Sequence, residues 1–377
     1  MDLDDFDTFR IATCDLNGQM RGKRMPQKDQ GKLASGDLRM PLSVLNVDIW
    51  GADIANSPLL FASGDGDGYL LPTNRGPVPM PWLDQPSALV GMWMFEEDGR
   101  PFEGDPRHAL AQILDCYAAR GWQVVAATEL EFYLIDDSAE SPRPPKDPAS
   151  NRKIDSSAIL SLQQLDAFEA FFSELYQSCA QMGINAQAAS SEAGIGQFEI
   201  SLQHGDALRI ADDTWLFKTL LKGVARKHGY AASFMAKPYP NDAGNGLHLH
   251  FSVLDEAGEN IFDDGTKQGS PLLQNAVAGC LATMRAATLG FAPHANSYAR
   301  MDPENHAPTS ICWGYENRTA ALRIPAGAPR ARRIEHRVAG GDINPFLTLS
   351  LVLGAALLGI EDDLTPPPPI TGNAYSQ

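Results

Sequence analysis

The sequence predicts an α+β protein with two domains. Its 377 residues are more than one small hydrophobic core usually holds. Residues 8–100 are rich in short apolar runs separated by turn residues, and a proline-rich stretch over residues 72–86 ends this section. From Pro106 onward, helical and strand-like patterns alternate. We therefore place a boundary near residue 104, between domains at 1–104 and 105–377.

The first domain contains a clear hairpin signal. Residues 10–16 and 20–25 flank Asn17-Gly18, a dipeptide typical of tight turns between antiparallel strands. The second domain carries helical patterns; in one of them, apolar residues step by three and four from Leu162 to Cys179. The predicted helices cover residues 106–120, 162–179, 212–229, 271–289 and 345–364. The last is too short and too interrupted by glycine to span a membrane, which needs about 20 apolar residues, so we predict a buried helix.

Composition excludes several classes of protein. The chain is 44% hydrophobic with a net charge of −17, which suits a globular protein and disfavours nucleic-acid binding. Its five cysteines form no Cys-x-x-Cys pair, so neither a disulfide framework nor a zinc knuckle is indicated. The acidic N-terminus does not resemble a signal peptide. We expect a cytoplasmic protein without membrane partners.

Four predicted strands each present one apolar face and one charged face. Residues two apart on a strand point to the same side, so in residues 128–134 Glu129 and Glu131 share a face opposite Leu130 and Phe132. The polar faces of the other three strands hold Gln197, Glu199 and Ser201; His248, His250 and Ser252; and Arg333, Glu335 and Arg337.

One such strand alone would indicate an antiparallel sheet with one solvated face. Four strands whose polar positions are mostly Glu, His and Arg, with no Lys, favour a shared polar cavity instead. An oxygen-rich set with one or two histidines suits Mg²⁺ or Mn²⁺ rather than structural zinc. Arginines beside divalent ions are suited to phosphate groups, and no Walker-type glycine loop or kinase His-Arg-Asp motif is present.

With these residues in place, the chain resembles the glutamine synthetase superfamily along nearly its whole length. Ile195 stands where the family usually has proline, and the remaining motifs occur in the family's order. They are Asp15-Leu-Asn-Gly-Gln-Met-Arg21-Gly-Lys23, Thr128-Glu-Leu-Glu-Phe132, Glu192-Ala-Gly-Ile-Gly-Gln-Phe-Glu199, Phe234-Met-Ala-Lys-Pro238, Gly244-Asn-Gly-Leu-His248-Leu-His250, Asn296-Ser-Tyr-Ala-Arg300, Asn317-Arg318, Arg323-Ile-Pro325 and Arg333-Ile-Glu-His-Arg337.

The resemblance implies a β-grasp N-terminal domain and a catalytic domain with a curved antiparallel sheet flanked by helices. It also implies a role for each motif residue. The implied ligands of one divalent ion are Glu131, Glu192 and Glu199, and those of the second are Glu129, His248 and Glu335. The implied contacts of ATP are His250, Ser252 and Arg333, those of the transferring phosphate are Arg318 and Arg323, and those of glutamate are Gly244, Arg300 and Arg337.

In the reaction that the resemblance implies, ATP phosphorylates the γ-carboxylate of glutamate and an amine then displaces phosphate. Two or more Mg²⁺ or Mn²⁺ ions serve each site. The resemblance also implies a homo-oligomer, a dodecamer of two stacked rings. The family pattern runs on for several dozen residues after the proline-rich segment 366–369, so the chain is expected to be shortened at its C-terminal end.

Two departures from the family bear on the amine. Ammonia-using members carry a Glu where this chain has His306, and an Asp-Gly-Ser-Ser motif that this chain lacks. The segments Trp313-Gly-Tyr-Glu-Asn-Arg318 and His336-Arg-Val-Ala-Gly-Gly-Asp-Ile-Asn-Pro345 resemble the γ-glutamylpolyamine synthetase branch. We therefore expect putrescine or another primary amine as acceptor, with His306 as a candidate base or amine contact. The alternatives are a glutamine synthetase that uses ammonia and a non-catalytic assembly protein of this family.

Overall fold

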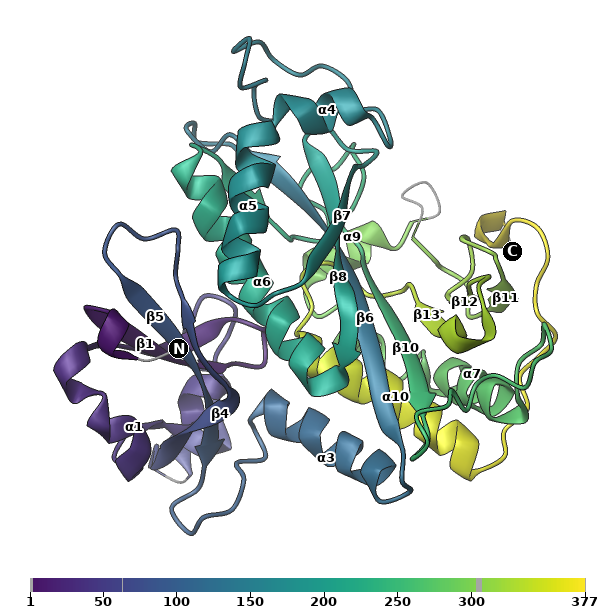
Figure 1. The fold of residues 1–377 in the computed structure, drawn as a ribbon, viewed down its shortest axis with the longest axis horizontal. Helices are drawn as coiled ribbons and strands as arrows, with labels where there is room; N and C mark the ends of the chain where they lie inside the picture. Colours follow the sequence, from purple (N-terminus) through teal and green to yellow (C-terminus); the bar gives the residue numbers. More distant parts are fainter. Residues whose placement is uncertain (1–2, 63, 303–306, 377) are drawn as a thin grey trace.

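The computed structural model describes residues 3–62, 64–302 and 307–376. It confirms the α+β class: a small sheet at the N-terminus lies beside a larger sheet that is surrounded by helices (Figure 1). The predicted boundary near residue 104 falls in the segment between the last strand of the first sheet and the first long helix.

The first sheet has five strands in the order β2-β1-β5-β4-β3. Strands β1 and β5 are parallel, and the other neighbours are antiparallel. The predicted hairpin is confirmed as β1 and β2, joined across Asn17-Gly18. The strands are β1 (Thr8–Cys14), β2 (Met20–Pro26), β3 (Arg39–Pro41), β4 (Asp67–Pro79) and β5 (Ser87–Phe95), with short helices α1 (Gly31–Ser35) and α2 (Pro58–Phe61) in the connections.

The second sheet has the order β11-β12-β13-β10-β6-β8-β7, with β9 paired to β6. The sheet is antiparallel as expected, except at one edge, where β11 and β12 are parallel. There the short loop 316–321 turns back through hydrogen bonds from Thr319 to Asn317, and both strands run in one direction. The strands are β6 (Gln123–Ile135), β7 (Ala186–Ser191), β8 (Gln197–Asp206), β9 (Ala231–Ser233), β10 (Leu247–Leu254), β11 (Trp313–Tyr315), β12 (Leu322–Ile324) and β13 (Ile334–His336).

Helices cover this sheet, and three of the predicted helices differ from the observed ones by a break or by more than three residues. The helix predicted over 162–179 is two helices because the backbone leaves helical geometry at Phe168, whose ring packs edge-on against Phe198. The helix predicted from residue 212 begins at Ala207, because the Asp206 side chain caps it by accepting from Arg209 N. The helix predicted over 271–289 ends at Thr283. The helices are α3 (Pro106–Ala118), α4 (Leu162–Ala167), α5 (Glu169–Gln181), α6 (Ala207–Lys227), α7 (Pro271–Thr283), α8 (Thr288–Phe291), α9 (Ala295–Arg300) and α10 (Pro345–Glu361).

The apolar helix α10 lies in the core, as predicted. Phe346 and Leu353 are fully buried, and the helix packs against α3, α6 and α7. The Leu353 carbonyl accepts a hydrogen bond from the Tyr117 hydroxyl of α3, at 2.9 Å. Within the described part of the chain, no helix combines the length and apolarity required to cross a membrane.

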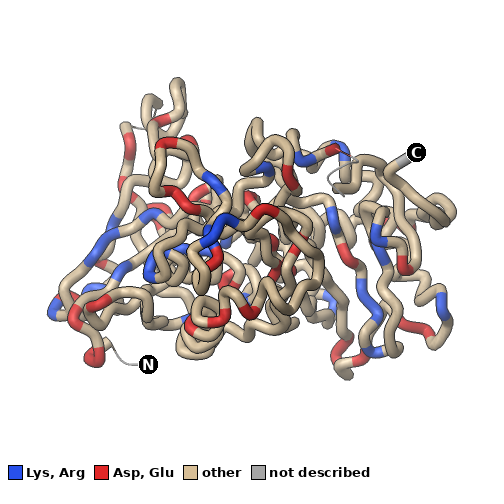
Figure 2. The backbone as a smooth tube through the Cα atoms, turned by 90° about the horizontal axis from the view of Figure 1, so that it is seen from above, with Lys and Arg blue, Asp and Glu red and all other residues tan. Residues whose placement is uncertain are grey.

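Charged residues of both signs are interspersed along the backbone (Figure 2). Some of these charges are paired in the interior, where helix α6 meets the first sheet. Arg107 at the start of α3 binds Asp212 of α6 through two contacts of 2.8 Å, and Arg75 of β4 lies 3.1 Å from Asp213. The Arg75–Asp213 pair joins β4 of the first sheet to α6. Loss of one partner of such a buried pair costs a great deal, so this pair holds the first sheet against the helix.

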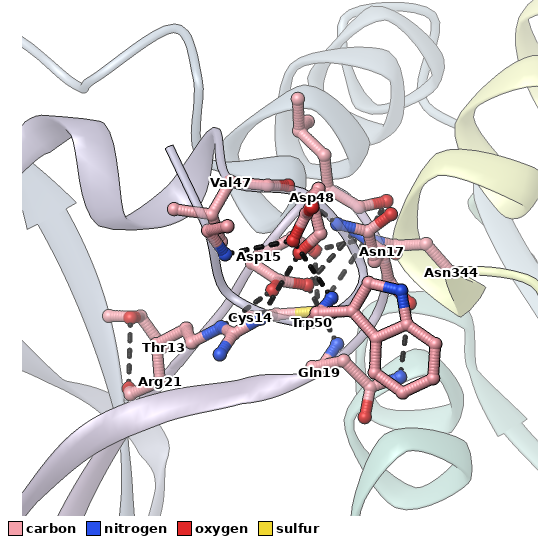
Figure 3. A network of polar contacts seen from close by, with 12 residues as sticks. Thr13, Cys14, Asp15, Asn17, Gln19, Arg21, Val47, Asp48, Trp50 and Asn344 are labelled. Carbon is pink, nitrogen blue, oxygen red and sulfur yellow. Dashed lines mark hydrogen bonds and ion pairs between the residues drawn. The ribbon is translucent and has the colours of Figure 1, made fainter. Parts of the chain in front are cut away.

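A second polar network joins the β1–β2 hairpin to α10 (Figure 3). Asn344 caps α10 by accepting from Phe346 N at 3.0 Å, and its Nδ2 donates to the Asp15 carbonyl at 2.8 Å. The fully buried Asp15 carboxylate in turn holds Arg21 at 2.7 Å. The Asn344 side chain therefore caps the N-terminus of a core helix and docks the hairpin on it.

We predict that Asn344→Ala lowers the free energy of unfolding by about 2 to 4 kcal/mol, from a lost helix cap and an unpaired buried carbonyl. Asn344→Ser keeps a capping oxygen but is too short to reach Asp15, so it should recover about 1 kcal/mol of that loss. Urea unfolding of the three proteins measures both steps. An Asn344→Ala protein within 0.5 kcal/mol of the parent, a difference of about the size expected for a neutral surface change, would contradict this docking role.

Candidate active site

The register of the three central strands brings the predicted carboxylates and histidines together. Glu129 of β6 lies directly opposite His248 of β10 on one side and Ser201 of β8 on the other. Glu131 lies opposite Glu199 of β8. Directly paired residues of antiparallel strands share one face of the sheet, so these side chains form a cluster.

The same pattern extends to the next strands. His250 of β10 lies opposite Glu335 of β13, and Glu335 lies opposite Arg323 of β12. Arg323 Nη1 binds Glu335 Oε2 at 2.8 Å, and Arg337 binds the other oxygen of the same carboxylate. Glu335 is therefore held between two guanidinium groups at the edge of the cluster.

Two cavities open beside this cluster, and Glu129 lines both. One, of about 640 Å³, contains most of the side chains that the family resemblance assigns to metal, phosphate and glutamate: Glu129, Glu131, Glu192, Glu199, His248, Gly244, Arg300, Arg318 and Arg337. The other, of about 460 Å³, contains the three residues assigned to ATP: His250, Ser252 and Arg333.

Two groups of three side chains bring their ligand atoms within 4.8 Å of one another: Glu129, Glu199 and His248, and Glu129, His250 and Glu335. His248 Nδ1 lies 3.1 Å from Glu129 Oε2, and His250 Nε2 lies 3.2 Å from Glu129 Oε1. The grouping differs from the predicted ligand sets, because His250 joins the cluster and Glu131 and Glu192 lie beside these triads.

The electrostatics of the cavity favour a cation. Burial, reinforced by neighbouring carboxylates, raises the pKa of Glu199 to about 9 and that of Glu192 to about 7. Burial acts the same way on Glu129, but hydrogen bonds from His248 and His250 outweigh it and hold the Glu129 pKa below its usual range. Carboxylates that repel one another beside imidazole nitrogens are a donor set that suits Mg²⁺ or Mn²⁺.

These pKa values predict that Mn²⁺ binding at pH 7 releases about one to two protons, because Glu199 and part of Glu192 must ionise. Both folded-state values exceed the ordinary 4.5, so the stability these groups contribute is present below pH 4.5. It is lost as the pH rises through about 7 and about 9, and Mn²⁺ should stabilise the protein increasingly over that range. Calorimetry in buffers of different ionisation enthalpy counts the protons. Release of none at pH 7 would contradict the prediction.

The glutamate side of the larger cavity is built around Arg300. This side chain is buried, and its Nη1 donates to the Val338 carbonyl at 2.9 Å. Gly244 lies against it: an added Cβ would meet Arg300 Cγ at 2.8 Å and the Ala236 carbonyl at 2.7 Å. Because residue 244 is glycine, its backbone and the Arg300 side chain can both lie at the wall of the cavity.

In the second cavity, Arg333 Nε donates to His250 Nδ1 at 3.2 Å. This contact fixes the histidine ring and leaves its Nε2 directed at Glu129. A cationic side chain, a histidine and the Ser252 hydroxyl thus line the second cavity, a set that fits a phosphate-bearing ligand.

The candidate base or amine contact His306 lies outside the described residues. Several lining residues were not singled out by the sequence, among them Ile159, Leu160, Thr319 and Tyr375. The first two belong to a loop without periodicity, and Tyr375 lies outside the motifs to which the sequence assigned a role in the site. Hydrogen bonds from Asn317 Nδ2 to the Gly372 carbonyl and from Ala374 N to Thr319 Oγ1 bring Tyr375 to the cavity.

The fold and this cluster define the class of the protein. The chain belongs to the glutamine synthetase family: the family model "Glutamine synthetase, catalytic domain" matches residues 103–377. This confirms the family that the motifs predict.

Relatives of known activity match almost the whole chain. It is 36% identical over 371 residues to γ-glutamylputrescine synthetase PuuA of Escherichia coli, covering 97% of this chain and 78% of the relative. It is 32% identical to the glutamate–isopropylamine ligase of a Pseudomonas species, covering 98% and 81%, and 35% identical to the glutamine synthetase of Thermus thermophilus, covering 97% and 80%. A solved structure of GmaS with ADP superimposes with a TM-score of 0.84 at 27% identity, covering 98% and 82%.

Proposed function

We propose that this protein is an ATP-dependent ligase that joins a primary amine to the γ-carboxylate of glutamate. The observation that carries the proposal is Glu129, which lies between a cavity with His250, Ser252 and Arg333 and a cavity with Arg300 and Arg337. A nucleotide in the first and glutamate in the second would meet at the carboxylate cluster. Relatives that act on putrescine and isopropylamine support an amine as the acceptor.

The reaction has two steps. An oxygen of the glutamate γ-carboxylate attacks the γ-phosphorus of ATP, the bond to the bridging oxygen breaks, and ADP leaves. The amine nitrogen, having given up a proton, then attacks the γ-carbon of the acyl phosphate. The carbon–oxygen bond to phosphate breaks, and an amide and inorganic phosphate result. The first step makes a carboxylate oxygen a good leaving group, and holding the reactants in line supplies much of the rate.

Residues in different parts of the site would bind different parts of the reactants. The candidate holders of the divalent ions are Glu129, Glu131, Glu192, Glu199, His248 and Glu335, and bound ions would offset the charge of three approaching anions. Arg318 and Arg323 would bind the transferring phosphate, and Gly244, Arg300 and Arg337 would orient glutamate. His250, Ser252 and Arg333 would hold the nucleotide.

An amine is favoured over ammonia because the chain lacks the acidic groups that hold ammonium in the family's ammonia-using members. His306 stands where those members have Glu, and no Asp-Gly-Ser-Ser occurs. Loss of each charged hydrogen bond would weaken the binding of ammonium, a small and fully charged ligand, by about 1.5–3 kcal/mol.

A phosphate-release assay with glutamate, ATP and Mg²⁺ tests the proposal. We expect kcat/KM for putrescine or a short alkylamine to exceed that for ammonium. A clear preference for ammonium would make the protein a glutamine synthetase, and absence of turnover with every amine would favour a non-catalytic member of the family.

We further propose a cytoplasmic homo-oligomer built from stacked rings. Trp50 is 90% exposed and Phe61 67% exposed on the first domain, with Ile49 and Ile54 also exposed nearby in sequence. Figure 3 places Trp50 next to the Asp15–Arg21 network, which holds its loop in position. Contiguous exposed apolar patches mark association surfaces, and we propose that these side chains contribute to one. Light scattering after gel filtration gives the number of subunits, with twelve expected.

A further inference from the structure

An aliphatic pair lies at the edge of the acidic cavity. Ile159 and Leu160 both line it, and among its described lining residues they are the only aliphatic side chains larger than alanine. Both are solvent-exposed, Leu160 at 70%. The rest of the lining is dominated by Glu, His and Arg, so the pair is a local apolar surface within a charged site.

The backbone holds this pair in place from both sides of Glu192. Leu160 N donates to the Ser191 carbonyl at 2.9 Å, and the buried Ser191 hydroxyl donates to the Ala158 carbonyl at 2.8 Å. On the other side, the Ser157 hydroxyl donates to the Ala193 carbonyl. The loop carrying Ile159 and Leu160 is thus fastened to the residues that flank an acidic side chain of the cavity.

Leu160 adopts a left-handed backbone conformation, with φ of 59°. A side chain other than Gly, Asn or Asp rarely adopts it, since it costs about 1–2 kcal/mol. A leucine that is strained, exposed and turned to a cavity gains nothing from burial within its own chain. Strain of this kind, when the surroundings enforce it, commonly accompanies a ligand site.

We infer that Ile159 and Leu160 form the subsite for the hydrocarbon part of the acceptor amine, and so select alkylamines over ammonium. This inference rests on the proposed amine ligase function. An alkylammonium ion pairs a cationic head with an apolar body, and the cavity offers carboxylates beside an aliphatic surface. Ammonium has no apolar body and gains nothing from the pair.

A series of linear amines measures the contribution. Burying one methylene is worth about a fourfold gain in binding, so kcat/KM should rise by about two- to fourfold for each carbon from ethylamine to butylamine. Leu160→Asn tolerates the left-handed conformation and removes the apolar surface. We expect it, and more strongly Ile159→Ser/Leu160→Asn, to flatten this dependence to below about 1.5-fold per carbon.

Leu162→Asn is the matched control. Leu162 belongs to the same region, is 73% exposed and does not line the cavity, so the slope should stay as in the parent protein. A parent slope near zero, equal flattening by Leu162→Asn, or a change of oligomeric state in Leu160→Asn that accompanies the flattening would each overturn the inference. Turnover of ammonium but of no alkylamine would instead overturn the proposed function.

Discussion

Glu129→Gln should lower kcat/KM by about 1,000-fold, because a neutral amide cannot replace the carboxylate as a ligand in both candidate metal groups. Glu129 lies in both candidate metal groups and lines both cavities. Its carboxylate oxygens face different histidines, His248 at 3.1 Å and His250 at 3.2 Å. Gln is close to it in size but supplies one neutral oxygen in place of two charged ones.

The same substitution should weaken metal binding as well as lower turnover. We expect Mn²⁺ affinity, measured by calorimetry, to fall by at least about 100-fold, more than for loss of a group that only supports a ligand. Glu259→Gln makes the same change at an exposed turn and should behave as the parent protein. A Glu129→Gln enzyme within tenfold of the parent activity, about the change expected from one bystander hydrogen bond, would remove Glu129 from the reaction centre.

The face on which each candidate side chain lies could be predicted from the sequence, because strand alternation is a local property. Strand β6 runs from Gln123 to Ile135 and contains the predicted strand 128–134, with Glu129 and Glu131 on the polar face and the fully buried Leu130 and Phe132 opposite. Apolar and charged residues in strict alternation leave only one way to bury the strand.

The partner of each side chain could not be predicted in this way. Pairing of Glu131 with Glu199, and of His250 with Glu335, depends on the register between strands far apart in the chain. The family resemblance gave His250 to the nucleotide, whereas its ring also lies 3.2 Å from Glu129. Register is set by the three-dimensional fit of the sheets and turns, which one sequence does not encode locally.

Irregular segments were missed for a related reason. Leu160 and Tyr375 reach the larger cavity from loops held by hydrogen bonds to other segments, without any periodic pattern of their own. The break at Phe168 was missed because the helical spacing of apolar residues continues through it. The packing of the Phe168 ring among other aromatic rings determines the backbone conformation at this residue. The local spacing of apolar residues carries no information about such a contact.

Arg300→Lys should raise KM for glutamate by about 100-fold while KM for ATP stays within about twofold. Lysine keeps the positive charge but loses the planar fork that can bind a carboxylate through two parallel hydrogen bonds. Arg300 lines the cavity with Arg337 and is absent from the lining of the cavity assigned to the nucleotide. The separate effects on the two KM values therefore test that assignment.

Gly244→Ala tests the assignment of this cavity to glutamate by crowding the backbone beside Arg300. Its new Cβ would lie 2.7 Å from the Ala236 carbonyl and 2.8 Å from Arg300 Cγ, so either the chain or the arginine must shift. We expect KM for glutamate to rise here too, whereas Arg285→Lys, at an exposed position, should leave both KM values unchanged. If both cavity variants raised KM for ATP instead, the assignments of the two cavities would have to be exchanged, because Arg300 would then be acting on the nucleotide.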